Sequence, residues 1–148
     1  MRIKIVLIFC FISFLCACSE VNFDFVDGNS KELGEYRGQW LLVNYWAVWC
    51  QPCLKEIPEL NEFNTRPEVE VLAFNYDRLD EASLKDQISK FDIQYRSLSL
   101  DPAELFNQDT PTGLPATMVI NPKGEFVEWL YGAQTKESLS EALKRSSL

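Results

Sequence analysis

Histidine is absent from this 148-residue chain, and positive charge is scarce, with 14 basic residues against 22 acidic ones. The missing histidine excludes mixed Cys/His zinc sites, copper sites that need a histidine ligand, and c-type haem attachment through Cys-x-x-Cys-His. The net charge of -8 argues against a nucleic-acid surface and against electrostatic attachment to an anionic membrane. We therefore expect no nucleic-acid partner, no metal and no other cofactor.

The N-terminus is a hydrophobic segment that begins with basic residues. Arg2 and Lys4 precede an apolar run over residues 5–17, a pattern typical of a secretory signal peptide. The run is shorter than the roughly 20 residues that a membrane-spanning helix needs, so a spanning anchor is the less favoured alternative. We predict that residues 1–17 are a signal peptide and that the rest of the chain is exported.

The end of this segment, "LCAC" at residues 15–18, resembles the bacterial lipobox. The resemblance implies a lipid on Cys18, which then becomes the first residue of the mature chain. The alternative is a plain signal cut that leaves Cys18 as a free thiol. We expect residues 18–21 to be a lipidated end with a short tether, and residues 22–148 to be one domain held at the extracytoplasmic side of a bacterial membrane. Ser19, in place of Asp, is compatible with the outer membrane.

Two apolar runs predict the centre of the fold. Residues 41–47 and 69–76 are rich in β-branched, aromatic and aliphatic residues, as strands buried on both faces are. Between them, residues 50–64 carry apolar side chains at helical spacing. A strand, a helix and a second strand form a βαβ unit, so the two strands should be parallel.

Shorter patterns extend this unit on both sides. A strand over residues 22–26 precedes it, and Asp80 is a candidate N-cap for the following helix. A short strand over residues 95–100, a short helix over residues 103–107, an antiparallel hairpin over residues 116–131 and an amphipathic C-terminal helix complete the prediction. Together they predict an α/β fold in which helices flank a central mixed sheet.

The stretch "WAVWCQPC" places Cys50 and Cys53 where the first buried strand ends and the helix begins. Free backbone N–H groups and the positive helix end stabilise a thiolate at Cys50, which makes it the attacking sulfur. Cys53 lies one turn inside the helix, where it can close a disulfide and resolve a mixed one. A purely structural disulfide is the alternative, but so small a loop removes little unfolded-chain entropy.

The chain resembles the thioredoxin superfamily, and within it the exported TlpA/ResA/CcmG-like thiol-disulfide oxidoreductases, many of them lipoproteins. The resemblance is carried by "LLVNYWAVWCQPCLKEIPEL" and by "TGLPATMVINPKGEFVEWLYG", and covers residues 22–148. It implies a thioredoxin-like fold, a redox-active Cys50–Cys53 disulfide, and a cis Leu114–Pro115 bond that faces the cysteines. An ordinary trans proline is the alternative for Pro115.

The resemblance also suggests roles for neighbouring residues. The buried Asp of thioredoxin is replaced by Asn44, whereas Glu56 matches a glutamate of ResA-like proteins and is a candidate proton carrier for Cys53. A solvated surface carboxylate is the alternative for Glu56. Leu114 and Pro115 would bind an extended client segment beside Cys50, and Trp49 would offer an apolar contact to the partner.

The direction of electron flow is only partly readable from the sequence. Strong oxidants of the DsbA type resemble Cys-Pro-His-Cys, whereas Gln51 and Pro52 add no charge between the cysteines. We therefore expect a protein-disulfide reductase, regenerated by a membrane donor of the DsbD/CcdA type, with exported clients such as apocytochrome c during cytochrome c maturation. The alternatives are a disulfide-forming or isomerising enzyme and a non-catalytic binding module on the same fold.

Overall fold

The computed structural model describes residues 21–147. The predicted signal peptide (residues 1–17), the predicted lipidation site Cys18 and the tether as far as residue 20 lie outside the described residues. Among the residues that are described, no helix is both long enough and apolar enough to cross a membrane.

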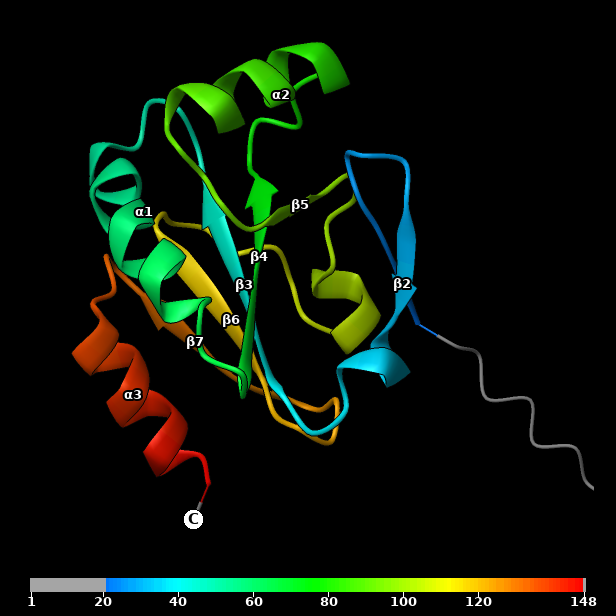
Figure 1. Ribbon diagram of the computed structural model, residues 1–148, viewed down its shortest axis with the longest axis vertical. Coiled ribbons are helices and arrows are strands. Elements are labelled where there is room, and N and C mark those ends of the chain that lie inside the picture. Colours follow the sequence, from blue (N-terminus) through cyan, green and yellow to red (C-terminus); the bar gives the residue numbers. More distant parts are fainter. Residues whose placement is uncertain (1–20, 148) are drawn as a thin grey trace, which may run out of the picture.

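A five-stranded mixed sheet forms the centre of the molecule (Figure 1). Its strands lie in the order β5 (Arg96–Leu98), β4 (Val69–Asn75), β3 (Trp40–Trp46), β6 (Ala116–Ile120) and β7 (Phe126–Tyr131). β3, β4 and β5 are parallel, whereas β6 is antiparallel to both of its neighbours. The predicted mixed sheet, the parallel βαβ unit and the C-terminal hairpin are thereby confirmed.

β3 is buried on both faces because it lies in the middle of this sheet. Leu42 and Trp46 pack with the helices, while Leu41, Val43 and Tyr45 belong to the core on the opposite face. Alternate side chains of a strand point to opposite faces, so a strand with two buried faces is apolar throughout. The nearly continuous apolar run in the sequence reflects this position.

The strand registers bring three chain segments to one end of the sheet. Trp46 at the end of β3 pairs with Asn75 at the end of β4, and Tyr45 pairs with Ala116 at the start of β6. The segments that follow β3 and β4 therefore lie beside the segment that precedes β6.

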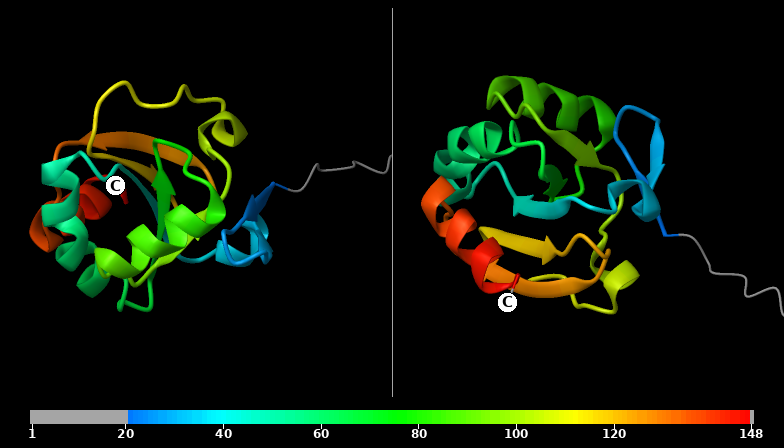
Figure 2. Two further views of the ribbon diagram at one scale, coloured as in Figure 1. Left: turned by 90° about the horizontal axis from the view of Figure 1, so that it is seen from above. Right: turned by 60° about the horizontal axis from the view of Figure 1, so that its bottom comes forward.

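Three α-helices pack into the core on one face of the sheet: α1 (Gln51–Phe63), α2 (Glu81–Lys90) and α3 (Lys136–Arg145). α1 and α3 contact each other and lie side by side in both views of Figure 2. The opposite face packs against the N-terminal segment and two short 3-10 helices, η1 (Leu33–Tyr36) and η2 (Ala103–Phe106). The predicted N-cap of α2 is confirmed, since the side chain of Asp80 accepts a hydrogen bond from the N–H of Ser83.

The N-terminal segment differs from the single strand predicted over residues 22–26. β1 (Asn22–Asp24) is shorter, and Gly28, with φ of 83°, lies in a turn that leads to β2 (Ser30–Glu32), the antiparallel partner of β1. Phe25 instead forms an isolated bridge with Leu98. The apolar residues predicted the strand, but a turn closed by the hydrogen bond from Phe25 N–H to the C=O of Asn29 ends it early.

Asp101 fixes the connection between β5 and β6. Its Oδ1 accepts hydrogen bonds from the Tyr45 hydroxyl at 2.7 Å and the Ala103 N–H at 3.0 Å, and its Oδ2 accepts one from the Thr110 hydroxyl at 2.6 Å. Because Tyr45 belongs to β3, these bonds tie the segment that leads to residue 115 to the central strand.

Candidate active site

Cys50 and Cys53 lie at the junction of β3 and α1. Cys50 is the N-cap residue of α1 and forms a disulfide with Cys53, with 5.3 Å between the two Cα atoms. The N–H of Cys53 donates to Sγ of Cys50 at 3.3 Å, so the first turn of the helix supplies a donor to this sulfur. Cys50 is 4% exposed and Cys53 is fully buried. The arrangement can exchange two electrons between a dithiol and a disulfide.

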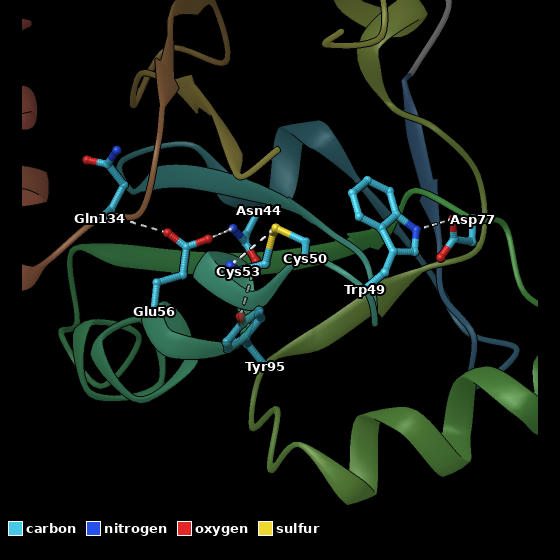
Figure 3. The surroundings of a disulfide bond; sticks show 8 residues. All are labelled: Asn44, Trp49, Cys50, Cys53, Glu56, Asp77, Tyr95 and Gln134. Carbon is cyan, nitrogen blue, oxygen red and sulfur yellow. Dashed lines mark hydrogen bonds between the residues drawn. A yellow bond between two sulfur atoms is a disulfide. The ribbon is translucent and has the colours of Figure 1, made fainter. Parts of the chain in front are cut away.

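Glu56 is buried one turn further along α1, with only 2% of its surface exposed. Its Oε1 accepts a hydrogen bond from Asn44 Nδ2 at 2.8 Å, and its Oε2 accepts one from the backbone N–H of Gln134 at 2.7 Å (Figure 3). Burial raises the pKa of Glu56 from 4.5 to about 7, although the bonds from Gln134 and Asn44 act in the opposite direction. The alternative of a solvated surface carboxylate is therefore wrong.

Asn44 connects Glu56 to a further buried polar group. Its Oδ1 lies 3.4 Å from the hydroxyl of Tyr95, which donates to it from the segment just before β5. Burial, and then the charge of Glu56, raises the pKa of the Tyr95 hydroxyl well above its usual value, so this group stays protonated. Sequence reasoning missed Tyr95 and Gln134, whereas a polar Asn44 inside an apolar strand was the available signal for the network.

The Leu114–Pro115 peptide bond is cis, as the resemblance implied. The C=O of Pro115 accepts a hydrogen bond from the N–H of Gly132 at 2.9 Å. Leu114 packs against both hydrophobic clusters, one of which contains Cys50 and Cys53. Within residues 21–147, no backbone hydrogen bond engages the N–H or the C=O of Leu114. Its peptide groups can therefore accept a new partner.

The two tryptophans before the cysteines occupy different environments. Trp46 is fully buried, and its ring contacts Phe91 edge-on. Trp49 is 60% exposed, and its Nε1–H donates to Asp77 Oδ1 at 3.0 Å, so the indole is oriented although it faces solvent. Figure 3 shows Trp49 and Asp77 beside the disulfide, on the side away from Glu56. Trp49 therefore presents an apolar surface next to Cys50.

These features define the class of the protein. A Cys-x-x-Cys disulfide at the start of the helix that follows a central strand, together with a cis-proline loop, is the active-site arrangement of thioredoxin-like thiol-disulfide oxidoreductases. No group of three or more metal-ligating side chains occurs within the described part of the chain.

Comparison with known proteins identifies the family. The chain belongs to the AhpC/TSA family, whose sequence model matches residues 17–129. It is 30% identical over 123 residues to the thiol-disulfide oxidoreductase ResA of Bacillus thuringiensis subsp. konkukian, a match that spans 81% of this chain and 70% of the relative. The protein is thus a thiol-disulfide oxidoreductase of the ResA type with a Cys50–Cys53 pair.

Solved structures show the same fold. A DsbF homologue from Corynebacterium diphtheriae aligns with a TM-score of 0.72 and 19% identity over 85% of this chain and 83% of the other. The exposed lipoprotein thioredoxin Etrx1 of Streptococcus pneumoniae aligns with a TM-score of 0.66 and 22% identity over 86% and 99%. Both confirm the predicted thioredoxin-like architecture.

The raised pKa of Glu56 predicts a stability that depends on pH. The folded-state pKa of about 7 lies above the unfolded value of 4.5. The stabilisation that comes from protonated Glu56 is therefore complete below about pH 4.5 and is lost as the pH rises through 7. Between these values the free energy of unfolding of the oxidised protein should fall by up to about 3 kcal/mol relative to that of a Glu56→Gln variant. Urea unfolding at several pH values measures this difference.

The exposed Glu68 provides the matched control for this measurement. A Glu68→Gln variant should keep the pH dependence of the wild-type protein. If the free energies of unfolding of Glu56→Gln and of the wild-type protein change by the same amount across this pH range, Glu56 does not titrate as described.

Proposed function

We propose that this protein is an exported reductase of protein disulfides, in which Cys50 attacks and Cys53 resolves. The observation that carries this proposal is the position of Cys50 as the N-cap of α1, with the N–H of Cys53 directed at its sulfur. This donor and the helix end stabilise a thiolate, while the Gln51–Pro52 spacer adds no charge that would stabilise it further. A thiolate stabilised only to this extent favours donating electrons.

The reaction proceeds in two exchanges. The Cys50 thiolate attacks one sulfur of the client disulfide, which forms a mixed disulfide and releases the other client sulfur as a thiolate. The Cys53 thiolate then attacks Sγ of Cys50 and releases the second client thiolate. The client gains two electrons and the protein loses two, which leaves the Cys50–Cys53 disulfide seen in the structure.

Glu56 is the proposed proton acceptor for Cys53 during the second exchange. The two residues are three apart on α1 and therefore lie on neighbouring positions of the same helix face. A carboxyl group with a pKa of about 7 is partly ionised at neutral pH, so it can both accept and return a proton. A membrane donor of the DsbD/CcdA type would then reduce the disulfide for the next cycle.

The client is proposed to bind along Leu114 and Pro115. The peptide groups of Leu114 make no backbone hydrogen bond within the described residues, so an extended client segment can pair with them. Trp49, the residue before Cys50, would also contact the client through its exposed indole. The proposed clients are disulfides of exported proteins, such as those of apocytochrome c.

A reductase should equilibrate with glutathione at a low potential. We expect the full-length protein to lie nearer the thioredoxin value, about -270 mV, than the DsbA value, about -120 mV. A Pro52→His variant adds a positive charge beside the cysteines and should shift the potential toward the DsbA value. A wild-type potential near that of DsbA would mean that the protein forms disulfides instead.

Removal of the resolving sulfur should trap clients. In cells that produce a full-length Cys53→Ser variant, mixed disulfides on Cys50 should accumulate and should disappear when the extract is reduced. The Cys50→Ser variant is the control and should trap none. Trapping by Cys50→Ser alone would exchange the two roles, and trapping by neither variant would favour a non-catalytic binding module.

We further propose that the mature chain is attached through a lipid on Cys18 to a bacterial membrane, on its extracytoplasmic side. The "LCAC" sequence supports this, and the similar protein Etrx1 is described as an exposed lipoprotein. Only residues 19–21 separate Cys18 from β1, so the anchor would hold the domain close to the bilayer.

Lipid attachment predicts a distinctive processing pattern. Globomycin, which inhibits the lipoprotein signal peptidase, should cause the precursor to accumulate, and the mature protein should carry the additional mass of the lipid. A Cys18→Ser variant should not be cleaved by this enzyme and should not gain the mass of the lipid. If globomycin does not change the processing of the wild-type precursor, residues 1–17 are an ordinary signal peptide.

A further inference from the structure

A cavity of about 170 Å³ lies between the N-terminal segment, the ends of β4 and β5, and the start of α2. Figure 1 shows these elements together at the upper part of the molecule, around the labels α2 and β5. Most of its wall is apolar and is formed by six side chains, namely Phe25, Val26, Phe74, Leu79, Leu84 and Leu98. Such a wall fits an uncharged group about the size of one side chain.

Asn75, the last residue of β4, is one of the polar residues that line this cavity, with Arg78, Glu81 and Ser99. It lies two residues after Ala73 and four after Val71, which belong to the core beneath the helices, so its side chain points to the same face of the sheet, the one that α2 covers. Asn75 is only 1% exposed, yet neither its Nδ2 nor its Oδ1 has a hydrogen-bond partner. A buried amide without partners is destabilising, and a ligand at this position would supply the missing hydrogen bonds.

The cavity adjoins the redox site through the loop after β4. The N–H of Tyr76 donates to the C=O of Trp46 at 2.8 Å, and Asp77 accepts the hydrogen bond from Trp49, the residue before Cys50. The flanking residues Asn75 and Arg78 both line the cavity. One side of this short loop therefore contacts the active site, and the other side forms the cavity wall.

We propose that this cavity binds the client polypeptide, with a peptide group of the client on the Asn75 amide and an adjacent apolar side chain between the apolar walls. This inference rests on the proposed function, since it assigns a second contact for the same client. A peptide group presents one donor and one acceptor, which matches the free Oδ1 and Nδ2 of Asn75. The two charged residues on the wall, Arg78 and Glu81, have opposite signs, and Arg78 lies 3.7 Å from Asp101, so a neutral group fits better than an ion.

Comparison of a polypeptide disulfide with a small one tests this assignment. The reduced full-length protein reacts with insulin or with 5,5′-dithiobis(2-nitrobenzoate), and only insulin carries the peptide groups and apolar side chains that the cavity is proposed to bind. An Asn75→Leu variant should lose about tenfold in the rate constant for insulin, because the client's peptide group would lose its partner. Its rate with the small disulfide and its equilibrium with glutathione should stay within about twofold of wild type.

Ser97→Ala is the matched control. The Ser97 hydroxyl is also buried and without a partner, it belongs to the neighbouring strand β5, and it does not line this cavity. The control should react with both disulfides at wild-type rates. Equal losses with insulin and the small disulfide in Asn75→Leu would overturn the proposal, as would wild-type rates with both.

A binding measurement on the wild-type protein covers the case in which Asn75→Leu does not fold. In NMR spectra of the oxidised full-length protein, N-acetyl-leucine N-methylamide should shift the side-chain NH₂ signals of Asn75 and the methyl signals of Leu84 in a saturable way. Unchanged signals would mean that the amide binds only water, and the proposal would be wrong. If wild type fails to reduce insulin but these signals shift, the reductase function fails while the cavity still binds peptide groups.

Discussion

The register of β3 with its two neighbours is the constraint on which the site depends. β3 lies between a parallel and an antiparallel partner, so the end of β3, the end of β4 and the start of β6 meet at one edge of the sheet. The disulfide, the Trp49–Asp77 pair and the Leu114–Pro115 loop come from these three places. A shift of one residue would turn every side chain of β3 to the opposite face and would move Cys50 away from both other segments.

A second constraint is the burial of a carboxylate near the disulfide. An ionised carboxyl group in the core is costly unless hydrogen-bond donors replace water. Asn44 and the backbone of Gln134 supply these donors, yet burial outweighs them and leaves the pKa of Glu56 at about 7. Because Gln134 directly precedes the N-cap of α3, the proton state of Glu56 is linked to the packing of the C-terminal helix as well as to α1.

The structure also distinguishes the redox interpretation of the cysteine pair from a purely structural one. A disulfide that closes a loop of this size stabilises the fold little. The β3–α1 junction is already fixed by a core that includes Trp46, Ile57 and Leu60. The disulfide lies instead beside a buried titratable group and an exposed, oriented tryptophan. A structural disulfide requires neither feature, whereas thiol-disulfide exchange can use a proton acceptor and a partner surface.

Local patterns in the sequence determined the βαβ unit, the hairpin, the N-cap of α2 and the redox pair. Each of these depends on residues close together in the chain, on the period of apolar side chains, or on a helix start. Local patterns gave a wrong strand end where pairing with a distant segment decides the structure. The apolar side chain of Phe25 predicted that the strand continues, but its backbone forms a bridge with Leu98. Resemblance to a known family, not any local pattern, anticipated the cis Leu114–Pro115 bond.

Tertiary structure alone decided the character of Glu56 and Asn75. From helical spacing, Glu56 was also compatible with a surface position. Nothing near it in the sequence indicated Tyr95 or Gln134 as members of its network. The sequence placed Asn75 only within a predicted strand over residues 69–76, yet it lines a cavity with its amide unpaired. The physical reason is the same in both cases: desolvation and hydrogen bonding depend on which segments pack around a side chain, and those segments are far apart in the sequence.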